Sequence, residues 1–326
     1  MISTDMRPVI IITGFLGAGK TTFLNELIAW RKEVKLAVIE NEFGEEGIDG
    51  DLIISADNNV FELSNGCICC SLSDDFYDLL ESLWKRKSEF DEMVIETTGI
   101  ADPASIASPF LTIAGMGNYY QLKRVICLVD ARHIERQLRE TDEARKQISF
   151  GDILLITKTD LVEADHLAYL ENLLQEINPF AKVLAGNKNG YPLDAIFDLE
   201  RSTIVQKRPK FSLVPQSLKQ HQHLDLVSLS FTFSEPFDIA LLQHRLTVFL
   251  NFQAENIYRV KGIIYAQEHN SRVILQSVNT DLAISYGSDW KHEELKQSRI
   301  VFIGKELKAP GFEKMLRQCL ALVAAK

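Results

Sequence analysis

Several features are missing from this sequence of 326 residues, and each absence excludes a class of protein. No apolar run approaches the roughly 18 residues that a membrane-spanning helix needs, so we expect no membrane span. The segment from Met1 to Arg7 has no charged lead followed by a long apolar stretch, so we expect no secretory signal. Five cysteines are too few to form a disulfide scaffold in a chain of this length.

Positive charge is also scarce. The 35 lysines and arginines stand against 45 aspartates and glutamates, which leaves a formal net charge of −10. A field of that sign repels nucleic acid and anionic membrane, so we expect neither as a partner. The hydrophobic fraction of 46% and the charged fraction of 25% are those of an ordinary globular protein and exclude wholesale disorder. We therefore expect a protein of the cytoplasm with one large or two medium domains.

The first two-thirds of the chain alternates short apolar runs with amphipathic stretches. Continuous apolar strands with helices between them predict an α/β fold, in which helices cover both faces of a mostly parallel sheet. The expected strands are residues 9–13, 35–40, 93–96, 125–129, 153–156 and 182–184. The expected helices are residues 21–31 and 166–177.

The character of the sequence changes near residue 205. The polar segment 206–222 contains two prolines and is typical of a linker, so we expect domains at 1–205 and 223–326. Beyond it we expect strands at 226–233, 257–265, 273–278 and 299–303, with a helix at 239–250. A last helix should begin near Gly311, with these residues at helical spacing: Phe312, Met315, Leu316, Leu320 and Val323. This order predicts a smaller α+β domain with an antiparallel sheet.

Residues 14–21, with the sequence GFLGAGKT, match the phosphate-loop pattern G-x-x-x-x-G-K-[ST]. The motif lies between a predicted strand and a predicted helix, where backbone N–H groups and the helix dipole attract phosphate. Lys20 is expected to reach the β- and γ-phosphates, and the Thr21 hydroxyl to bind Mg²⁺. The expected nucleotide-binding residues are Gly14, Phe15, Leu16, Gly17, Ala18, Gly19, Lys20, Thr21 and Thr22.

The sequence TKTD at residues 157–160 follows the predicted strand 153–156. The Asp160 carboxylate can accept hydrogen bonds from the N1–H and 2-amino groups of guanine, and adenine offers no such pair of donors. The stem of Lys158 is expected to lie along the base, and Thr157 completes the site. A solvated loop is the alternative, but the position of the motif downstream of a phosphate loop favours GTP over ATP.

Glu96 ends the predicted strand 93–96 and precedes Thr97, Thr98 and Gly99. A carboxylate near the phosphates can hold Mg²⁺ through water or orient the attacking water, and the Gly99 N–H can contact the γ-phosphate. We therefore assign Lys20 and Glu96 to catalysis. An ordinary strand-end carboxylate is the alternative for Glu96. Asp130 ends the next predicted strand and receives no role.

Three cysteines crowd into the sequence NGCICC at residues 65–70. Thiolates select Zn²⁺, Cu⁺ or another borderline-to-soft metal over Mg²⁺, so Cys67, Cys69 and Cys70 predict a transition-metal site. A redox pair and plain buried small residues are the alternatives, and a disulfide between Cys69 and Cys70 would need a strained turn. Such a cluster also favours a reducing compartment. Cys127 and Cys319 lie in apolar runs and are expected in the core.

An acidic segment at residues 40–46 follows the second predicted strand, where P-loop GTPases keep a nucleotide-sensing switch. Glu40 and Glu45 can supply oxygen ligands to the same ion as the cysteines, and a solvated acidic loop is the alternative. His221 and His223 would face one way in an extended segment. We favour solvated linker histidines over a metal entry site at that pair.

Together these motifs resemble the CobW/YjiA group of P-loop GTPases, whose members are tied to metal insertion. Residues 259–262 and 299–304 are similar to the C-terminal domain of that family, so the resemblance covers nearly the whole chain. It implies slow GTP hydrolysis and a zinc or cobalt site in which Cys69 is the best-supported ligand. Many members carry a long histidine-rich stretch before the C-terminal domain. Only His221 and His223 stand there in this sequence, which argues against metal storage.

The combination predicts a metal-linked GTP switch. GTP would order residues 40–46 and the cysteine segment, and hydrolysis would release the ion to a client metalloprotein. By reciprocity the metal must change the affinity for GTP by the same factor. A regulatory GTPase with a structural zinc, or a maturation factor for one metalloenzyme or for cobalamin synthesis, are the alternatives. A metal- or nucleotide-dependent homo-oligomer is compatible with each.

Overall fold

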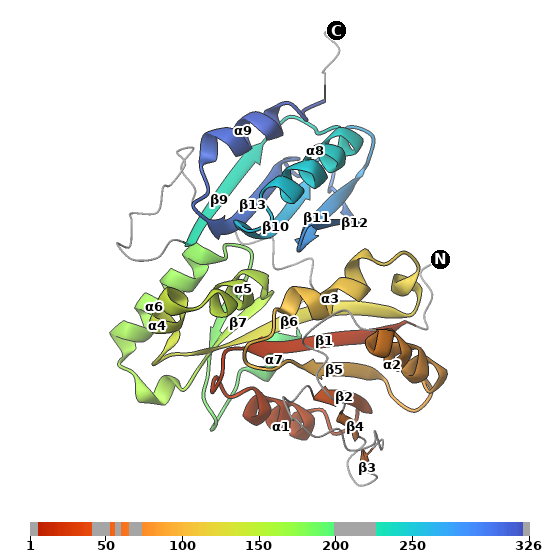
Figure 1. The fold of residues 1–326 in the computed structure, drawn as a ribbon, viewed down its shortest axis with the longest axis vertical. Helices are drawn as coiled ribbons and strands as arrows, with labels where there is room; N and C mark the ends of the chain where they lie inside the picture. Colours follow the sequence, from red (N-terminus) through yellow and green to blue (C-terminus); the bar gives the residue numbers. More distant parts are fainter. Residues whose placement is uncertain (1–5, 41–52, 56–59, 65–73, 199–225, 322–326) are drawn as a thin grey trace. The chain divides into compact units, whose positions relative to one another are not determined.

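The computed structural model describes residues 6–40, 53–55, 60–64, 74–198 and 226–321 (Figure 1). They divide near residue 201 into two compact units, each with its own sheet. No described helix is both long enough and apolar enough to cross a membrane. The predicted linker at 206–222 lies outside the described residues, so the domain boundaries stay a prediction.

The first unit alternates strands and helices in the order expected for an α/β fold. Its strands are β1 (Arg7–Gly14), β2 (Leu36–Glu40), β3 (Ile53–Ser55), β4 (Val60–Ser64), β5 (Glu92–Glu96), β6 (Tyr120–Asp130), β7 (Ile153–Thr157) and β8 (Lys182–Ala185). Its α-helices are α1 (Lys20–Trp30), α2 (Asp74–Lys85), α3 (Pro103–Thr112), α4 (Ile134–Glu140), α5 (Asp142–Phe150), α6 (Ala164–Ile177) and α7 (Leu193–Phe197). Two 3₁₀ turns complete it, η1 (Met116–Asn118) and η2 (Thr159–Leu161).

These strands form one eight-stranded sheet in the order β3-β4-β2-β5-β1-β6-β7-β8. Every neighbouring pair is parallel except β3 and β4, which are antiparallel. The predicted mostly parallel sheet is therefore confirmed. The short strands β3 and β4 are additions that the sequence pattern did not predict.

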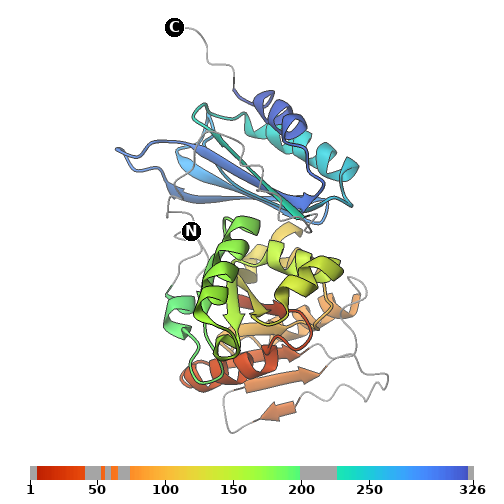
Figure 2. The same cartoon turned by 90° about the vertical axis from the view of Figure 1, so that its left-hand side faces the viewer.

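The central strand β1 shows why the apolar runs are continuous. Ile10 and Ile12 pack in one cluster with Phe23, Leu24 and Leu27 of α1. Successive side chains of a strand point to opposite faces, so Val9 and Ile11 face the other side, where α3 and α5 contact β1. Figure 2 shows α1 in red on one side of the sheet and the yellow to yellow-green helices α3 to α6 on the other. Because both faces are covered, each of these positions is apolar and buried.

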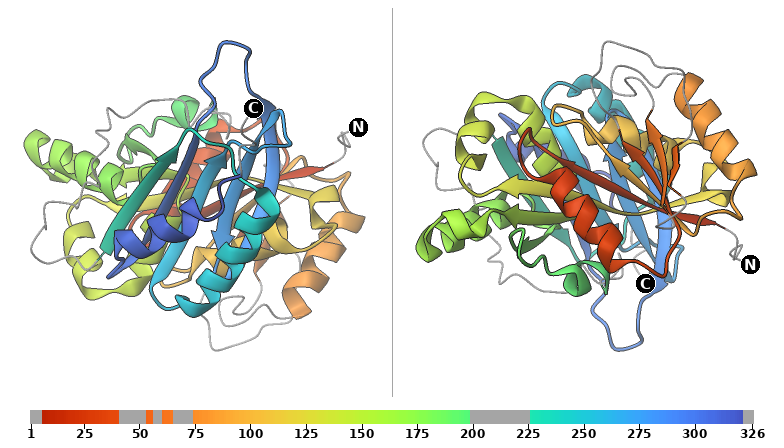
Figure 3. Two further views of the ribbon diagram at one scale, coloured as in Figure 1. Left: turned by 90° about the horizontal axis from the view of Figure 1, so that it is seen from above. Right: turned by 90° about the horizontal axis from the view of Figure 1, so that it is seen from below.

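The second unit contains β9 (Leu226–Phe233), α8 (Ile239–Phe252), β10 (Ile257–Ile264), β11 (Ser271–Val278), β12 (Asp281–Asp289), β13 (Ser298–Lys305) and α9 (Ala309–Arg317). Its five strands are antiparallel, in the order β12-β11-β10-β13-β9. Helices α8 and α9 cover one face of this sheet, with Leu246 and Phe312 in the shared core (Figure 3). The predicted α+β unit with an antiparallel sheet is confirmed.

This unit contains one strand that was not predicted, and the expectation for its last helix was wrong. Strand β12 was not predicted, because its sequence DLAISYGSD is largely polar and it lies at the edge of the sheet, mostly exposed. The last helix ends at Arg317 and does not reach Leu320. Leu320 instead forms a β-bridge with Phe237, and the neighbouring Ala321 N–H donates to the Pro236 carbonyl at 2.9 Å. Val323 lies outside the described residues.

Candidate functional site: a phosphate loop beside two carboxylates

The phosphate loop connects β1 to α1, and glycine is required at its turns. Gly14, Gly17 and Gly19 have φ angles of +141°, +76° and +92°, a region that favours glycine. A Cβ added to Gly14 would lie 2.4 Å from the Leu128 carbonyl oxygen on β6, which is closer than any real contact. The loop is closed by a hydrogen bond from the Ala18 N–H to the Phe15 carbonyl at 3.1 Å. Backbone geometry of this kind exposes N–H groups to an anion.

Lys20, the first residue of α1, folds back over this loop. Its ammonium donates to the Gly14 carbonyl at 2.9 Å and to the Phe15 carbonyl at 3.5 Å. Burial lowers the pKa of Lys20, while the negative charge of Glu96 raises it and partly opposes that effect. A largely desolvated ammonium beside the backbone of this loop can bind phosphate oxygens.

The next residue, Thr21, contacts the end of β5. Its Oγ1 donates to Glu96 Oε1 at 2.9 Å, and Glu96 is only 8% exposed. A hydroxyl and a carboxylate beside a phosphate loop are the hard oxygen donors that Mg²⁺ prefers, so these two residues fit that ion. Thr22, also predicted to bind nucleotide, is exposed on the first turn of α1.

The segment after Glu96 packs directly on the phosphate loop. Thr97 joins β1 through its N–H, which donates to the Ile12 carbonyl at 2.9 Å. A Cβ added to Gly99 would lie 2.5 Å from Leu16 Cδ2, so Gly99 is in close contact with the loop. The buried Thr98 Oγ1 has no hydrogen-bond partner among the described residues. These contacts place Gly99 beside Leu16 of the phosphate loop.

The guanine-type motif is tied to the same loop by two side chains. Thr157 Oγ1, at the end of β7, donates to the Ala18 carbonyl at 2.8 Å. Lys158 has a left-handed backbone, with φ +56°, and its ammonium donates to the Gly17 carbonyl at 2.6 Å. Asp160, two residues further on, is exposed to solvent.

Asp130 is part of this arrangement, although no motif predicted it. Its Oδ2 lies 2.5 Å from the Lys158 ammonium, and its Oδ1 accepts from the Arg132 N–H at 2.9 Å. Asp130 is 2% exposed and pairs in register with Thr157 on the neighbouring strand. The available signal was its place at the end of an apolar strand.

Two further residues border the motif from the loop after β8. Thr159 Oγ1 donates to the Gly186 carbonyl at 3.2 Å, and Asn187 Nδ2 contacts Thr159 Oγ1 at 3.5 Å. Neither Gly186 nor Asn187 belongs to a pattern that sequence reasoning singled out. These contacts join the loop after β8 to the TKTD motif at Thr159.

Among the predicted metal ligands, Glu40 lies within the described residues. It ends β2, where its Cα pairs with Glu96 on β5 and with Ser64 on β4. Registered neighbours in a parallel sheet point to the same face, so Glu40 and Glu96 project toward the same side. Ser64 is the last residue of β4, directly before the cysteine segment.

The other predicted transition-metal ligands lie outside the described residues: Glu45, Cys67, Cys69 and Cys70. His221 and His223, interpreted as solvated linker histidines, also lie outside them. Within the described part of the chain, no group of three or more histidine, cysteine, aspartate or glutamate side chains is placed to hold a metal ion. The predicted core positions of Cys127 and Cys319 are confirmed, since both are buried.

Comparison with known proteins agrees with this geometry. Residues 8–185 match the family model described as CobW/HypB/UreG, nucleotide-binding domain. Residues 226–320 match the model described as cobalamin synthesis protein cobW C-terminal domain.

Individual relatives extend the likeness over the whole chain. The zinc chaperone YjiA of Escherichia coli (strain K12) is 34% identical over 315 residues, which are 93% of this chain and 96% of that protein. The zinc-regulated GTPase metalloprotein activator 1 of Schizosaccharomyces pombe is 36% identical over 188 residues, which are 55% of this chain and 46% of that protein. A crystal structure of the Zn(II)-bound YjiA GTPase from E. coli matches with a TM-score of 0.73 and 29% identity, covering 97% of this chain and 99% of that one. The chain therefore belongs to the CobW/HypB/UreG family of nucleotide-binding proteins.

Proposed function

We propose that the protein is a GTPase that couples GTP hydrolysis to the transfer of zinc to a client metalloprotein, with cobalt as the second candidate metal. The observation that carries the coupling is the pairing of Glu40 with Glu96 on adjacent strands. Glu40 is assigned to the metal and Glu96 to the nucleotide, so a displacement of either strand end would change the position of the other.

In the proposed reaction a water molecule attacks the γ-phosphorus, the bond to the oxygen that bridges the β- and γ-phosphorus atoms breaks, and GDP and phosphate leave. Lys20 binds the β- and γ-phosphates and offsets their charge. Glu96 orients the attacking water, and the Gly99 N–H donates to the γ-phosphate. Thr21 would hold Mg²⁺, with Glu96 as a ligand through water if it does not orient the attacking water, and the ion would offset charge on the phosphates. Without an arginine from a partner, turnover is slow.

The base is proposed to be guanine. Asp160 accepts from the N1–H and 2-amino groups, while Thr157 and Lys158 hold the motif against the phosphate loop. The hydrogen bond from Thr157 to Ala18 and that from Lys158 to Gly17 fix the distance between base site and phosphate site. Because the base site and the phosphate site are linked in this way, a change at either site should weaken the affinity for the whole nucleotide.

The cargo is proposed to bind Cys67, Cys69 and Cys70, with Glu40 and Glu45 as oxygen ligands. Thiolates with one or two carboxylates suit Zn²⁺ and exclude Mg²⁺. Support comes from β4, whose last residue Ser64 pairs with Glu40, so the chain enters the cysteine segment from beside a predicted ligand. The thiols must stay reduced to bind the ion, which fits a cytoplasmic location.

The proposals of a client protein and of the direction of metal transfer are based on the names of the relatives. One is named a zinc chaperone and another a zinc-regulated GTPase metalloprotein activator. We infer a metalloprotein client that receives the ion when hydrolysis relaxes the site.

Two variants test the two halves of this function separately. Lys20→Ala should abolish GTP binding, and wild-type affinity for GTP in this variant would refute the phosphate-loop assignment. Cys69→Ser, titrated with Zn²⁺ against a colorimetric chelator, should bind zinc more weakly than wild type while it still hydrolyses GTP. Unchanged zinc affinity would refute the metal assignment and leave the GTPase assignment intact.

A further inference from the structure

Gln147, which has no role in the proposed function, makes two hydrogen bonds to the segment that follows Glu96. This residue of α5 is 1% exposed, and its Nε2 donates to the carbonyls of Gly99 and Ala101, both at 3.1 Å. The amide must present nitrogen here, because an oxygen would repel both carbonyls. A single buried side chain thus uses both of its donor hydrogens on the backbone next to the phosphate loop.

The backbone held by Gln147 is a tight turn. The Ala101 N–H donates to the Thr98 carbonyl at 3.2 Å, which closes residues 98–101. Before the turn, Thr97 is fixed to β1 through its N–H and through Thr97 Oγ1, which contacts Thr13 Oγ1 at 3.0 Å. The peptide that carries the Gly99 N–H is therefore bracketed by the sheet on one side and by Gln147 on the other.

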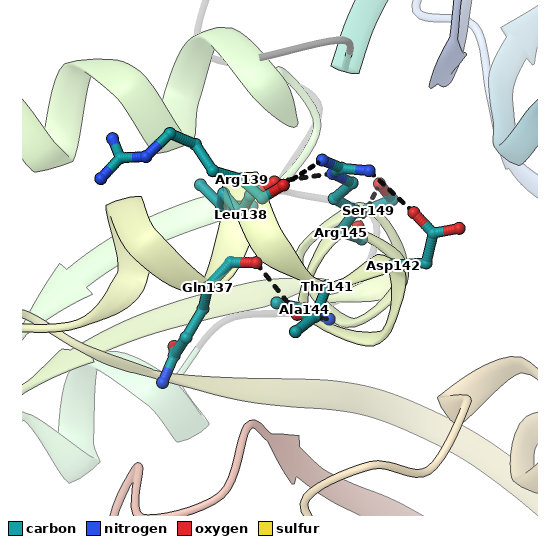
Figure 4. Close-up of polar contacts among 8 residues, drawn as sticks. All are labelled: Gln137, Leu138, Arg139, Thr141, Asp142, Ala144, Arg145 and Ser149. Atoms are coloured by element: carbon teal, nitrogen blue, oxygen red, sulfur yellow. Dashed lines mark hydrogen bonds and ion pairs between the residues drawn. The ribbon is translucent and has the colours of Figure 1, made fainter. Parts of the chain in front are cut away.

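The helix that carries Gln147, α5, is joined to α4 by polar contacts of Arg145 (Figure 4). The guanidinium of Arg145 donates to the carbonyls of Leu138 and Arg139 at 2.6 and 2.8 Å, and to Asp142 Oδ1 at 2.8 Å. These bonds join the end of α4 to the start of α5. A donor on a helix held by such contacts is restrained in position and can in turn restrain the segment that it bonds.

A second contact from α5 reaches the same region but is weaker. The Lys146 ammonium lies 3.1 Å from Asp102 Oδ2, and Asp102 Oδ1 caps α3 by accepting from the Ala104 N–H at 2.9 Å. The Lys146 side chain is 41% exposed, so water screens this ion pair. The buried amide of Gln147 is the dominant restraint.

We propose that Gln147 is a positioning residue that holds the Gly99 N–H toward the γ-phosphate and so sets the preference for GTP over GDP and the rate of hydrolysis. The proposal rests on the proposed placement of Gly99 beside the γ-phosphate. GDP lacks that phosphate, so its affinity does not depend on the turn. In this proposal Gln147 acts only through the backbone that it holds, by its bonds to the Gly99 and Ala101 carbonyls.

The test compares Gln147→Met with wild type, because methionine keeps the length and loses both donors. We expect GDP affinity within about twofold of wild type, and about tenfold losses both in affinity for a non-hydrolysable GTP analogue and in kcat. The control is Gln175→Met on α6, whose Nε2 donates to the Ala181 carbonyl at 3.3 Å. It makes the same chemical change away from the turn and should leave the analogue-to-GDP affinity ratio unchanged.

The outcomes separate the possible failures. Equal losses of GDP and analogue affinity, or no loss of either affinity or of kcat, would overturn the positioning role while the GTPase stands. A wild-type protein that binds GDP and the analogue equally would instead refute the placement of Gly99. Should Gln147→Met fail to fold, Gln147→Asn serves the same comparison, because it keeps both donors but holds them one methylene further from the carbonyls. Its analogue-to-GDP affinity ratio should fall below that of wild type, but by less than about tenfold.

Discussion

Thr21 Oγ1 donates to Glu96 Oε1 at 2.9 Å, across 75 residues of sequence. This bond joins the helix after the phosphate loop to the end of β5, and the next strand along the sheet places Glu40 in register with Glu96. Residues proposed for the nucleotide site and a predicted metal ligand are thus linked by one hydrogen bond and one strand pairing. The proposed coupling between GTP and metal follows this short path.

The carboxylate of Glu96 should matter for hydrolysis more than for binding. Glu96→Gln keeps the shape but weakens the polarisation of water, so we expect kcat to fall about 100-fold with GDP affinity little changed. Glu92→Gln is the control, because Glu92 begins the same strand and pairs with Arg31 at 3.3 Å, away from the loop. Single-turnover hydrolysis measures the rate, and a GDP titration measures the affinity, in both variants. An equal loss of rate in the two variants would contradict the role of Glu96.

The backbone of Gly14 should tolerate no side chain. With φ at +141° and the Leu128 carbonyl 2.4 Å from an added Cβ, Gly14→Ala must shift the start of the loop. We expect a loss of stability of about 2 kcal/mol and loss of GTP binding. An added Cβ at Gly117 meets nothing within 4 Å, so Gly117→Ala should change neither property. Thermal unfolding with and without GTP tests the pair, and normal binding by Gly14→Ala would contradict the loop geometry.

Asp130 should govern affinity for the base. Asp130→Asn removes the charge that holds the Lys158 ammonium at 2.5 Å, so the lysine stem loses its fixed position. We expect GDP affinity to fall about tenfold, because Lys158 also bonds Gly17 of the phosphate loop. Asp91→Asn is the control; the Asp91 carboxylate accepts from the Lys35 N–H at an exposed site. Unchanged GDP affinity in Asp130→Asn would refute this role.

The buried thiols should stay inert in the native protein. Burial raises the pKa of Cys127 to about 12 and that of Cys319 to about 11, so both remain protonated and unreactive at pH 8. We expect no more than three of the five cysteines to react with a thiol reagent before unfolding, and zinc to protect those that do. Labelling of Cys127 or Cys319 in the folded protein, read by mass spectrometry, would contradict their burial.

The same shifts give a pH dependence of stability. A thiol with a raised folded pKa contributes stability that is fully present below its unfolded pKa, near the ordinary value of 9.0. That contribution is lost as pH rises from about 9 toward the folded pKa of about 12 for Cys127. Chemical unfolding of wild type and Cys127→Ala across this range measures it. The difference in unfolding free energy between them should shrink as pH rises, and a constant difference would contradict the shift.

The sequence predicted the parts of the site that are local in the chain. The phosphate loop is readable because its glycines, lysine and threonine are consecutive, and strand β1 and helix α1 flank it as expected. The contacts that were missed join distant segments. Asp130 contacts Lys158 across 28 residues of sequence, and Gln147 contacts Gly99 across 48. In neither pair does the sequence around one residue indicate which residue it contacts. Such contacts depend on strand order, which a single sequence does not specify.

The central claim is that the nucleotide controls the metal. The direct measurement is the zinc affinity of the purified protein without nucleotide, with GDP and with a non-hydrolysable GTP analogue, all with Mg²⁺ present. We predict a difference of about tenfold or more between nucleotide states, which is roughly 1.4 kcal/mol of coupling. Equal zinc affinity in all three states would contradict the account, and the cysteines would then hold a structural ion in a GTPase that regulates something else.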